Sequence, residues 1–271
     1  MSPGRSRDQN GGFASTSDVG SKPGDTVSLW SERHPDLIAV LESAAALQKS
    51  VPDAVLVGGS VAAMYAGHRL SFDHDHVLTN LMSRYEAVLE AVEATEGWAT
   101  SVKASRPPMT LMGSLGGIEA GLRQLRRKVP LETVRVAVPN GEQVTVPTLG
   151  EALRVKAYLV VVRNQVRDYL DVVALADRLG GEAAAAVLRL IDDYYLDRSE
   201  DGDSVATILV QRLAEPNPRD DKVIEQLSSY KGLTRTWQDW SVVTAACNDL
   251  AQLMLEAGEA MSERSDVGVK Q

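Results

Sequence analysis

Two carboxylates separated by a single residue form the pattern in this chain that is best suited to chemistry. They are Asp73 and Asp75, in the run Ser71-Phe72-Asp73-His74-Asp75-His76. On a β-strand, side chains two residues apart point to the same face, so both carboxylates would reach one pair of hard cations while His74 and His76 face the other way. Carboxylate-held Mg²⁺ ions neutralise the oxygens of a reacting triphosphate. The pattern therefore predicts a metal-dependent nucleotide site.

A glycine turn precedes these carboxylates. The apolar run 55–57 leads into Gly58-Gly59-Ser60, which predicts a buried strand, a tight turn and the start of a helix. Glycine lets the backbone approach a phosphate closely, and Ser60 would lie where a helix N-terminus presents free N–H groups to an anion. His68 and Arg69 follow that helix, where a cation either contacts phosphate or compensates the charge of the helix C-terminus.

A second group of charged residues lies in the segment 154–171. At helical spacing Lys156, Arg163 and Arg167 fall on one arc beside the apolar arc, provided that the helix continues through residues 164–165. A lysine there would hold a triphosphate or the leaving pyrophosphate, and the arginines would bind phosphate oxygens bidentately. Asp168 and Asp171 would position a base, a ribose, a metal-bound water or one of these cations. The alternative is an ordinary amphipathic helix with a solvated or salt-bridged rim.

The charge of the whole chain limits the partners that we expect. The net charge is −9, which argues against broad affinity for polyanions, because nonspecific nucleic-acid binding depends on phosphate neutralisation. A local basic surface is still compatible with this balance, and a solvated edge is its alternative. The candidates for such a surface, which would bind a nucleic-acid acceptor, are Arg123, Arg126, Arg127 and Lys128.

Composition places the chain among globular proteins with one large domain or two modest ones. It has 271 residues, of which 44% are hydrophobic. Residues 1–28 contain few apolar residues and are expected to form a disordered arm. The sequence shows no leader-like or membrane-spanning apolar segment, so we expect a cytoplasmic protein with no membrane partner. The single cysteine, Cys247, is expected to be a small core residue and offers neither a disulfide nor a zinc cluster.

The elements that must position these residues follow from periodicity and capping signals. We expect a first helix from about Pro35, then the strand and glycine turn, a short helix closed by Gly67, and the carboxylate strand. The further expected helices are 80–96, 149–163, 166–179, 182–196, 204–213, 222–229 and 234–261, and the further strands are 98–103, 109–112, 118–125, 131–138 and 143–146. Asn140-Gly141 is typical of a hairpin turn, and Thr148 with Glu151 of a helix cap.

Expected strands give way to expected helices at Pro147, and this change predicts a domain boundary. The expected fold class is α+β, with a mixed sheet and flanking helices followed by a helical C-terminal domain. The expected divisions are an N-terminal arm (1–28), a catalytic core (29–147), a helical domain completing the cleft (148–262) and a frayed tail (263–271).

Taken in order, these motifs resemble the AbiEii/MenT nucleotidyltransferase toxins, within the DNA polymerase β-like nucleotidyltransferase superfamily. The resemblance covers about residues 55–179. It rests on Gly58-Gly59-Ser60 followed by Asp73-x-Asp75, on Lys156-x-x-x-Val160-x-x-Arg163, on Arg167-Asp168-x-x-Asp171, and on the strand-like run 117–125.

The resemblance implies the toxin half of a bacterial toxin–antitoxin pair with a separately encoded antitoxin. Such an enzyme would transfer a nucleoside monophosphate from an NTP to the acceptor end of tRNA, with two Mg²⁺ ions, and so block translation. It implies metal ligation by Asp73 and Asp75, a catalytic or triphosphate-binding Lys156, and Asp168 as the acidic residue paired with the helix of that lysine. The implied phosphate neighbours are Gly59, Ser60 and Ser71. Glu119 is offered as a third carboxylate, on a strand that also carries Gln124.

Three alternatives remain open at this stage. In the first, the enzyme modifies a protein or a small molecule instead of tRNA. In the second, the chain binds NTP or a partner without turnover. In the third, His74 and His76 bind a metal, although no further ligands are evident beside them.

Overall fold

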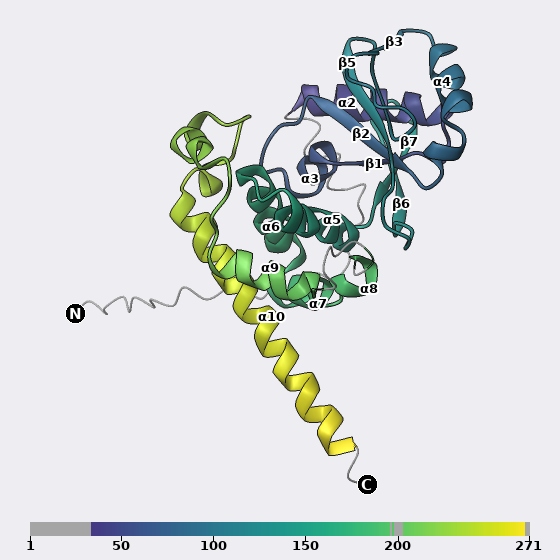
Figure 1. Cartoon of the computed structure of the whole chain (residues 1–271). Coiled ribbons are helices and arrows are strands. Elements are labelled where there is room, and N and C mark those ends of the chain that lie inside the picture. The colour runs from purple at the N-terminus through teal and green to yellow at the C-terminus, as the bar shows by residue number, and fades with distance from the viewer. Residues whose placement is uncertain (1–33, 196, 198–202, 269–271) are drawn as a thin grey trace, which may run out of the picture.

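The computed structural model describes residues 34–195, 197 and 203–268, with side chains to residue 256, so the predicted arm lies outside the described residues. Figure 1 shows the sheet at one side of the molecule and a group of helices at the other. The helices are α2 (Pro35–Ser50), α3 (Gly59–Ala66), α4 (Tyr85–Glu93), α5 (Leu149–Val162), α6 (Val166–Leu179), α7 (Gly181–Arg189), α8 (Ile191–Tyr195), α9 (Val205–Ala214) and α10 (Trp240–Gly268). The 3₁₀ helices are η1 (Leu81–Ser83), η3 (Asp221–Ser229) and η4 (Arg235–Trp237).

The main sheet is mixed, as predicted for this fold class. Its five strands lie in the order β1 (Val55–Val57), β2 (Asp73–Leu78), β5 (Ile118–Gln124), β4 (Thr110–Leu115) and β3 (Trp98–Thr100). Only β2 and β5 run parallel, and the other neighbouring pairs are antiparallel. A separate hairpin joins β6 (Thr133–Ala137) to β7 (Gln143–Pro147) through the predicted Asn140-Gly141 turn, where Gly141 has a positive φ. The α+β prediction is confirmed.

The two faces of the main sheet differ in burial. One face packs against α2 and α4 through a cluster that includes Leu47, Leu78, Val88, Leu111 and Leu122. On the other face Asp73 and Asp75 are half-buried, and Glu119 and Arg123 on β5 are exposed. Because neighbouring strands keep their side chains in register, all four polar residues lie on this second face. The sheet therefore presents its charged face outward and its apolar face to two helices.

The alternation predicted for β2 is confirmed by its histidines, which are fully buried on the apolar face. His74 Nε2 forms a hydrogen bond with Ser43 Oγ on α2 at 3.0 Å, and the two imidazole rings meet edge to face at 5.2 Å. Burial lowers the pKa of His74 to about 4, against a smaller opposing effect of Asp73. Both histidines therefore belong to the core as neutral side chains.

This burial predicts a pH dependence of stability. Between pH 6.5 and 4 the unfolded chain binds a proton at His74 that the folded chain does not, so stability falls as the pH is lowered through that window. The expected loss is about 3 kcal/mol. Urea unfolding from pH 7 to 4.5 should give a shallower pH slope for His74→Gln than for the wild type, and equal slopes would contradict the neutral, buried assignment.

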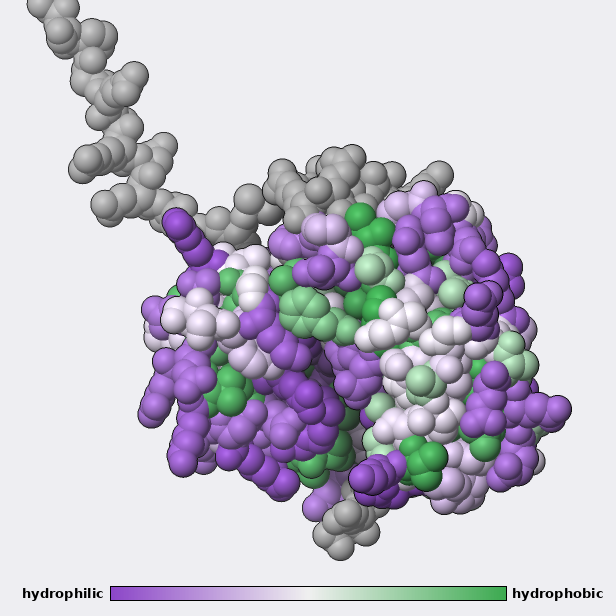
Figure 2. All heavy atoms as spheres, turned by 90° about the horizontal axis from the view of Figure 1, so that it is seen from above, coloured by the Kyte–Doolittle hydropathy of each residue, from purple (hydrophilic) through white to green (hydrophobic). Residues whose placement is uncertain are grey.

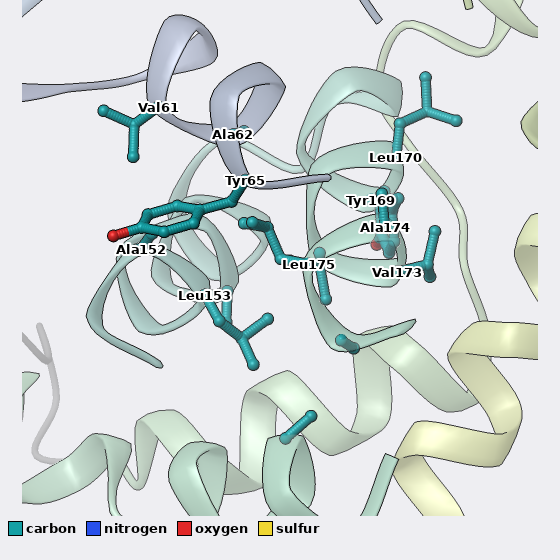
Figure 3. Close-up of a cluster of buried hydrophobic side chains, with 14 of the residues drawn as sticks. Val61, Ala62, Tyr65, Ala152, Leu153, Tyr169, Leu170, Val173, Ala174 and Leu175 are labelled. Atoms are coloured by element: carbon teal, nitrogen blue, oxygen red, sulfur yellow. The ribbon is translucent and has the colours of Figure 1, made fainter. Parts of the chain in front are cut away.

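The helical part of the chain shares its hydrophobic core with the N-terminal elements. Figure 3 shows Val61, Ala62 and Tyr65 of α3 facing side chains of α5 and α6. The Tyr65 hydroxyl also donates to the carbonyl of Pro147 at 2.8 Å. Strands give way to helices at Pro147, as predicted, whereas the division into two domains stays a prediction.

Thr148 begins α5 as expected. Its Oγ1 accepts a hydrogen bond from the amide of Glu151 at 3.2 Å, which satisfies one of the free N–H groups of the first turn. The reciprocal half of the capping box is replaced, because the Glu151 carboxylate pairs with Arg127 and Arg154 instead.

Several predicted elements differ from the observed ones. The predicted helix 80–96 is divided into η1 and α4, because the Met82 amide donates to the Gln124 side chain (2.9 Å) and Arg84 has a non-helical backbone. The predicted helix 182–196 is divided at Leu190 into α7 and α8, and residues 221–229 are 3₁₀. The helix α10 runs to Gly268, past the predicted start of the frayed tail, since no glycine or proline interrupts residues 259–267.

The outer surface is largely polar. The face shown in Figure 2 is mainly hydrophilic, and its hydrophobic residues lie in small separate patches. Within the described ranges, every helix is too short or too polar to pass through a lipid bilayer.

Candidate functional site

The glycine turn connects β1 to α3 and is shaped by two close contacts. Gly58 has φ +85°, which a side chain would disfavour, and Gly59 has no room for one. A Cβ on Gly59 would lie 2.7 Å from Ser71 Oγ and 2.9 Å from a terminal nitrogen of Arg69. Helical hydrogen bonding begins with the Ala62 amide, so the amides of residues 59–61 precede the ladder at the helix N-terminus. The Ser60 side chain is buried and points back to the Val57 carbonyl.

The two carboxylates lie directly beside this turn. Asp75 is the register partner of Val57 on β1, the residue before Gly58. The hydroxyl of Ser71 donates to Asp73 Oδ1 at 3.0 Å, and Nε of Arg123 donates to Asp75 Oδ1 at 3.2 Å. Asp73 and Asp75 are the register partners of Glu119 and Gly121 on the parallel strand β5. The predicted pair of carboxylates is therefore on one face, beside the predicted phosphate turn.

The carboxylate oxygens of Asp73 and Asp75 fit the coordination preferences of Mg²⁺. The ion is bound in proteins by one or two carboxylates, with water and substrate phosphates completing its shell. Asp73 and Asp75 supply two half-exposed carboxylates on one face, with the Ser71 hydroxyl beside them. Over the part of the chain that the structure covers, His, Cys, Asp and Glu side chains do not converge in groups of three or more. Glu119 is thus a neighbour of Asp73 in register, and the role of third ligand stays a prediction.

Asp171 is the centre of a buried ionic cluster behind the turn. Its carboxylate accepts hydrogen bonds from Arg69 through Nε (2.7 Å) and a terminal nitrogen (2.9 Å), and from His68 Nε2 (2.8 Å). Lys156 Nζ lies 2.7 Å from Asp171 Oδ2. All four side chains are almost completely buried. Two cations and one imidazole thus converge on one carboxylate, which makes the cluster a rigid anchor for the segment 68–71.

The charge of Asp171 is fixed by these partners. Burial alone would raise its pKa, but the charges of Arg69 and Lys156 and the hydrogen bonds from His68 and Arg69 outweigh burial and hold the pKa well below its ordinary value. Burial lowers the pKa of His68, so this ring is a neutral donor to an ionised carboxylate. Asp171 is therefore an ionised carboxylate near neutral pH.

The two groups of residues that the sequence singled out are brought together by Arg69. The terminal nitrogen of Arg69 that donates to Asp171 Oδ2 also packs against Gly59, next to Ser71. Gly58 and Lys156 also line one small, mostly apolar cavity. Residues about a hundred positions apart in sequence are therefore joined in a single site.

The predicted line of cations is wrong in its geometry. It assumed a helix through residues 164–165, whereas α5 ends at Val162 and Asn164 has φ +53°. The Asn164 side chain donates to the carbonyl of Asn217 (2.7 Å) and accepts from the Tyr169 hydroxyl (2.5 Å), which stabilises the break. The break separates Arg167 on α6 from Lys156 and Arg163 at the end of α5, and Lys156 is buried in an ion pair with Asp171.

Arg163 and Asp168 pair across this break. A terminal nitrogen of Arg163 donates to Asp168 Oδ1 at 2.6 Å, and the carboxylate is fully buried. The other oxygen, Oδ2, has no hydrogen-bond partner among the described residues. Arg163 is therefore held by an acid in the first turn of α6. A direct contact between its guanidinium and phosphate would require this pair to open.

The predicted basic surface is divided by the structure. Arg123, Arg126 and Lys128 are exposed, but Arg127 is buried, and this part of the prediction is wrong. The Arg127 guanidinium pairs with Glu151 (2.5 Å) and donates to the carbonyls of Val129 and Pro130. It also lies over the rings of Tyr194 and Tyr195, at 5.2 and 4.9 Å. Arg127 therefore joins the loop after β5 to α5 and α8.

Replacing Arg127 with alanine is expected to lower the free energy of unfolding by about 2 kcal/mol, because the ion pair with Glu151 and the hydrogen bonds to two carbonyls are lost. Arg126→Ala, at an exposed position, should change it by less than about 0.5 kcal/mol. Urea unfolding of both variants measures the difference. Equal stabilities would show that Arg127 is not structural.

Two parts of the site were not found from the sequence. The loop 230–234 binds the segment that carries His68 and Arg69, because the Leu70 amide donates to the Lys231 carbonyl and the Thr234 amide to the His68 carbonyl, both at 2.8 Å. A Cβ on Gly232 would lie 3.1 Å from the Leu70 side chain.

Gly121 was also missed, although it lies between Glu119 and Arg123 at the spacing of the open strand face. Its absent side chain leaves room for the Asp75 carboxylate, since a Cβ would lie 2.5 Å from Oδ1.

Comparisons with known proteins give matches of two kinds, and no protein-family model matches the chain. The Heme uptake protein MmpL11 of Mycobacterium tuberculosis is 30% identical over 230 residues, which are 82% of this chain and 23% of that protein. The Mycolic acid-containing lipids exporter MmpL11 of Mycolicibacterium smegmatis is 36% identical over 132 residues, 49% of this chain and 13% of that protein. The chain therefore spans less than a quarter of the length of these curated relatives.

Solved structures align with most of the chain at low identity. MenT4, a nucleotidyltransferase toxin from Mycobacterium tuberculosis H37Rv, aligns with a TM-score of 0.48 and 18% identity, over 88% of this chain and 86% of its own. JHP933 from Helicobacter pylori aligns with a TM-score of 0.46 and 16% identity, over 89% of this chain and 98% of its own.

Proposed function

We propose that this chain is a nucleotidyltransferase that moves a nucleoside monophosphate from an NTP to the acceptor end of tRNA, as the toxin of a toxin–antitoxin pair. The observation that carries the proposal is the placement of Asp73 and Asp75 beside the glycine turn, with the Asp171 cluster directly behind it. Half-exposed carboxylates on an open sheet face suit a reaction on a bound triphosphate, and a buried anchor keeps them in place.

In the proposed reaction a hydroxyl of the acceptor attacks the α-phosphorus of the NTP. A bond forms between that oxygen and phosphorus, the bond from phosphorus to the β-bridging oxygen breaks, and pyrophosphate leaves. The hydroxyl proton passes to a carboxylate of the site or to solvent. Mg²⁺ held by Asp73 and Asp75 supplies charge neutralisation and in-line alignment when bound.

The chain's own residues would bind and orient the substrate. The backbone of Gly58 and Gly59 lies close enough to the carboxylates to face phosphate, and the amides of residues 59–61 favour an anion. Arg69 and Lys156 add positive charge behind the turn, although both are engaged with Asp171. We infer that Lys156 acts on the substrate through the shape and charge of the anchor, and Asp168 by holding Arg163, unless these ion pairs open.

The test is incubation of purified protein with Mg²⁺, each α-³²P-labelled NTP and either total tRNA or a tRNA-free lysate. Label on tRNA with one favoured NTP is the expected result. Label confined to protein bands would replace tRNA by a protein acceptor, and NTP binding without any labelled product would favour a catalytically silent binding protein. Growth arrest on expression, relieved by Asp73→Asn and by a cognate antitoxin, would support the toxin assignment.

A further inference from the structure

Arg123 places a permanent cation on one of the two carboxylates of the site. Its Nε donates to Asp75 Oδ1 at 3.2 Å, and the side chains of Arg123 and Asp75 are 46% and 33% exposed. The other oxygen, Oδ2, lies on the side of the glycine turn, since a Cβ on Gly58 would be 3.8 Å from it. The two oxygens of Asp75 therefore have different neighbours, Arg123 on one side and the glycine turn on the other.

Gly121 is the residue that permits this arrangement. It is the register partner of Asp75 on β5, and a Cβ at this position would lie 2.5 Å from Oδ1 and 3.0 Å from the Met112 sulfur. The carboxylate of Asp75 thus lies across the neighbouring strand, within reach of Arg123 two residues further along. Asp73 differs, because its hydrogen-bond donor is the neutral hydroxyl of Ser71. Among the described residues, Asp75 is the one of these two carboxylates that forms a direct ion pair.

We propose that Arg123 is a positioning residue that competes with the divalent cation for Asp75 and, once displaced, binds phosphate of the acceptor. The proposal rests on the function proposed above. Arginine stays protonated at all relevant pH values, so a metal ion on the same carboxylate repels the guanidinium. A half-exposed ion pair is held weakly and is readily released. The released guanidinium would then offer its planar set of donors to a phosphate.

This exchange would couple binding of the metal ion to binding of the acceptor. While Arg123 is paired with Asp75, its Nε donates to the carboxylate and one terminal nitrogen donates to the Met112 sulfur, so these two nitrogens are engaged although the side chain is half-exposed. Metal binding frees them, so metal and acceptor each raise the affinity for the other by the same factor. Arg123 would thereby favour acceptor binding at a site that already holds its metal.

The first experiment measures Mn²⁺ binding by electron paramagnetic resonance for the wild type and for Arg123→Ala, Arg84→Ala and Asp75→Asn. Arg123→Ala should bind Mn²⁺ about two- to fivefold more tightly, which corresponds to the loss of one exposed competing ion pair. Arg84→Ala removes the same charge from an exposed pair with Asp53 and should leave the affinity unchanged. Unchanged or weaker binding in Arg123→Ala would overturn the proposal.

Asp75→Asn separates this proposal from the function on which it rests. Equal Mn²⁺ binding by the wild type and Asp75→Asn would remove the metal site, and with it both proposals. Binding that depends on Asp75 but is unaffected by Arg123→Ala would refute only the competition. Equal thermal midpoints for the wild type and the Arg123 variant establish that both are folded.

The second experiment measures the coupling directly. The affinity for a short fluorescent single-stranded RNA is determined by anisotropy with and without Mn²⁺. Mn²⁺ should raise the affinity of the wild type by a larger factor than that of Arg123→Ala. An equal metal-dependent increase in both proteins would refute the coupling.

Discussion

The Asp73→Asn variant is expected to lose nucleotidyl transfer by about a thousandfold while keeping the wild-type midpoint of thermal unfolding. Removing one anionic ligand lowers the charge stabilisation that a metal ion gives the transition state, which is worth several kcal/mol, and about 4 kcal/mol corresponds to that factor. Stability should be little changed, because Asp73 is half-buried and its described hydrogen bond comes from the Ser71 hydroxyl alone. Single-turnover transfer of labelled NTP to tRNA measures the effect.

Two control variants sharpen this prediction. Asp53→Asn removes an exposed acid that pairs with Arg84 and should leave transfer unchanged. Glu119→Gln tests the third carboxylate, and we expect a loss of a few-fold at most, because Glu119 is exposed and does not converge with Asp73 and Asp75 into a three-ligand group among the described residues. Near wild-type transfer by Asp73→Asn would contradict its role as a metal ligand.

The Asp171→Ala variant is expected to lose about 3–5 kcal/mol of unfolding free energy, the cost of removing one partner from a buried ion pair. Arg69 and Lys156 would then be two buried cations without the carboxylate that both contact. Because Arg69 also packs against Gly59 beside Ser71, the turn and the carboxylate strand should lose their fixed positions. Urea unfolding at pH 7 measures the loss.

Lys156→Met provides the matched comparison for this cluster. It removes one cation but leaves Asp171 with Arg69 and His68, so its loss of stability should be smaller than that of Asp171→Ala. The low pKa of Asp171 means that its contribution is present above the ordinary carboxyl range and is lost only as the pH falls through the lowered folded-state value. Equal losses for the two variants would show that Asp171 is not the centre of the cluster.

Local patterns predicted the parts of the site that lie close together in sequence. The alternation of Asp73, His74, Asp75 and His76 assigned both faces of β2 correctly, because the two-residue period of a strand is independent of the rest of the fold. The turn at Gly58, the end of α3 at Gly67 and the cap at Thr148 follow from backbone requirements of single residues. These features needed no knowledge of distant contacts.

Features set by distant contacts could not be predicted in this way. The break at Asn164 depends on a hydrogen bond to Asn217 and on the Tyr169 hydroxyl, and it turned the expected line of cations into two separate ion pairs. Arg127 is buried because Tyr194 and Tyr195 pack over its guanidinium from almost seventy positions away. The parallel register that sets Gly121 beside Asp75 likewise depends on two strands that are separated in sequence by η1, α4, β3 and β4.

The two hydrogen bonds between the loop 230–234 and the segment 68–70 also affect the order in which the site forms during synthesis. During synthesis the carboxylates of β2 leave the ribosome early, followed by Lys156 and Asp171, but the segment that bears Arg69 is held from its other side only when residues up to Thr234 have emerged. A nascent chain that stops before that point lacks this support. The support of this segment is therefore complete only when residues up to Thr234 have emerged, so that products ending before Thr234 should carry the carboxylates of β2 without a fully formed site.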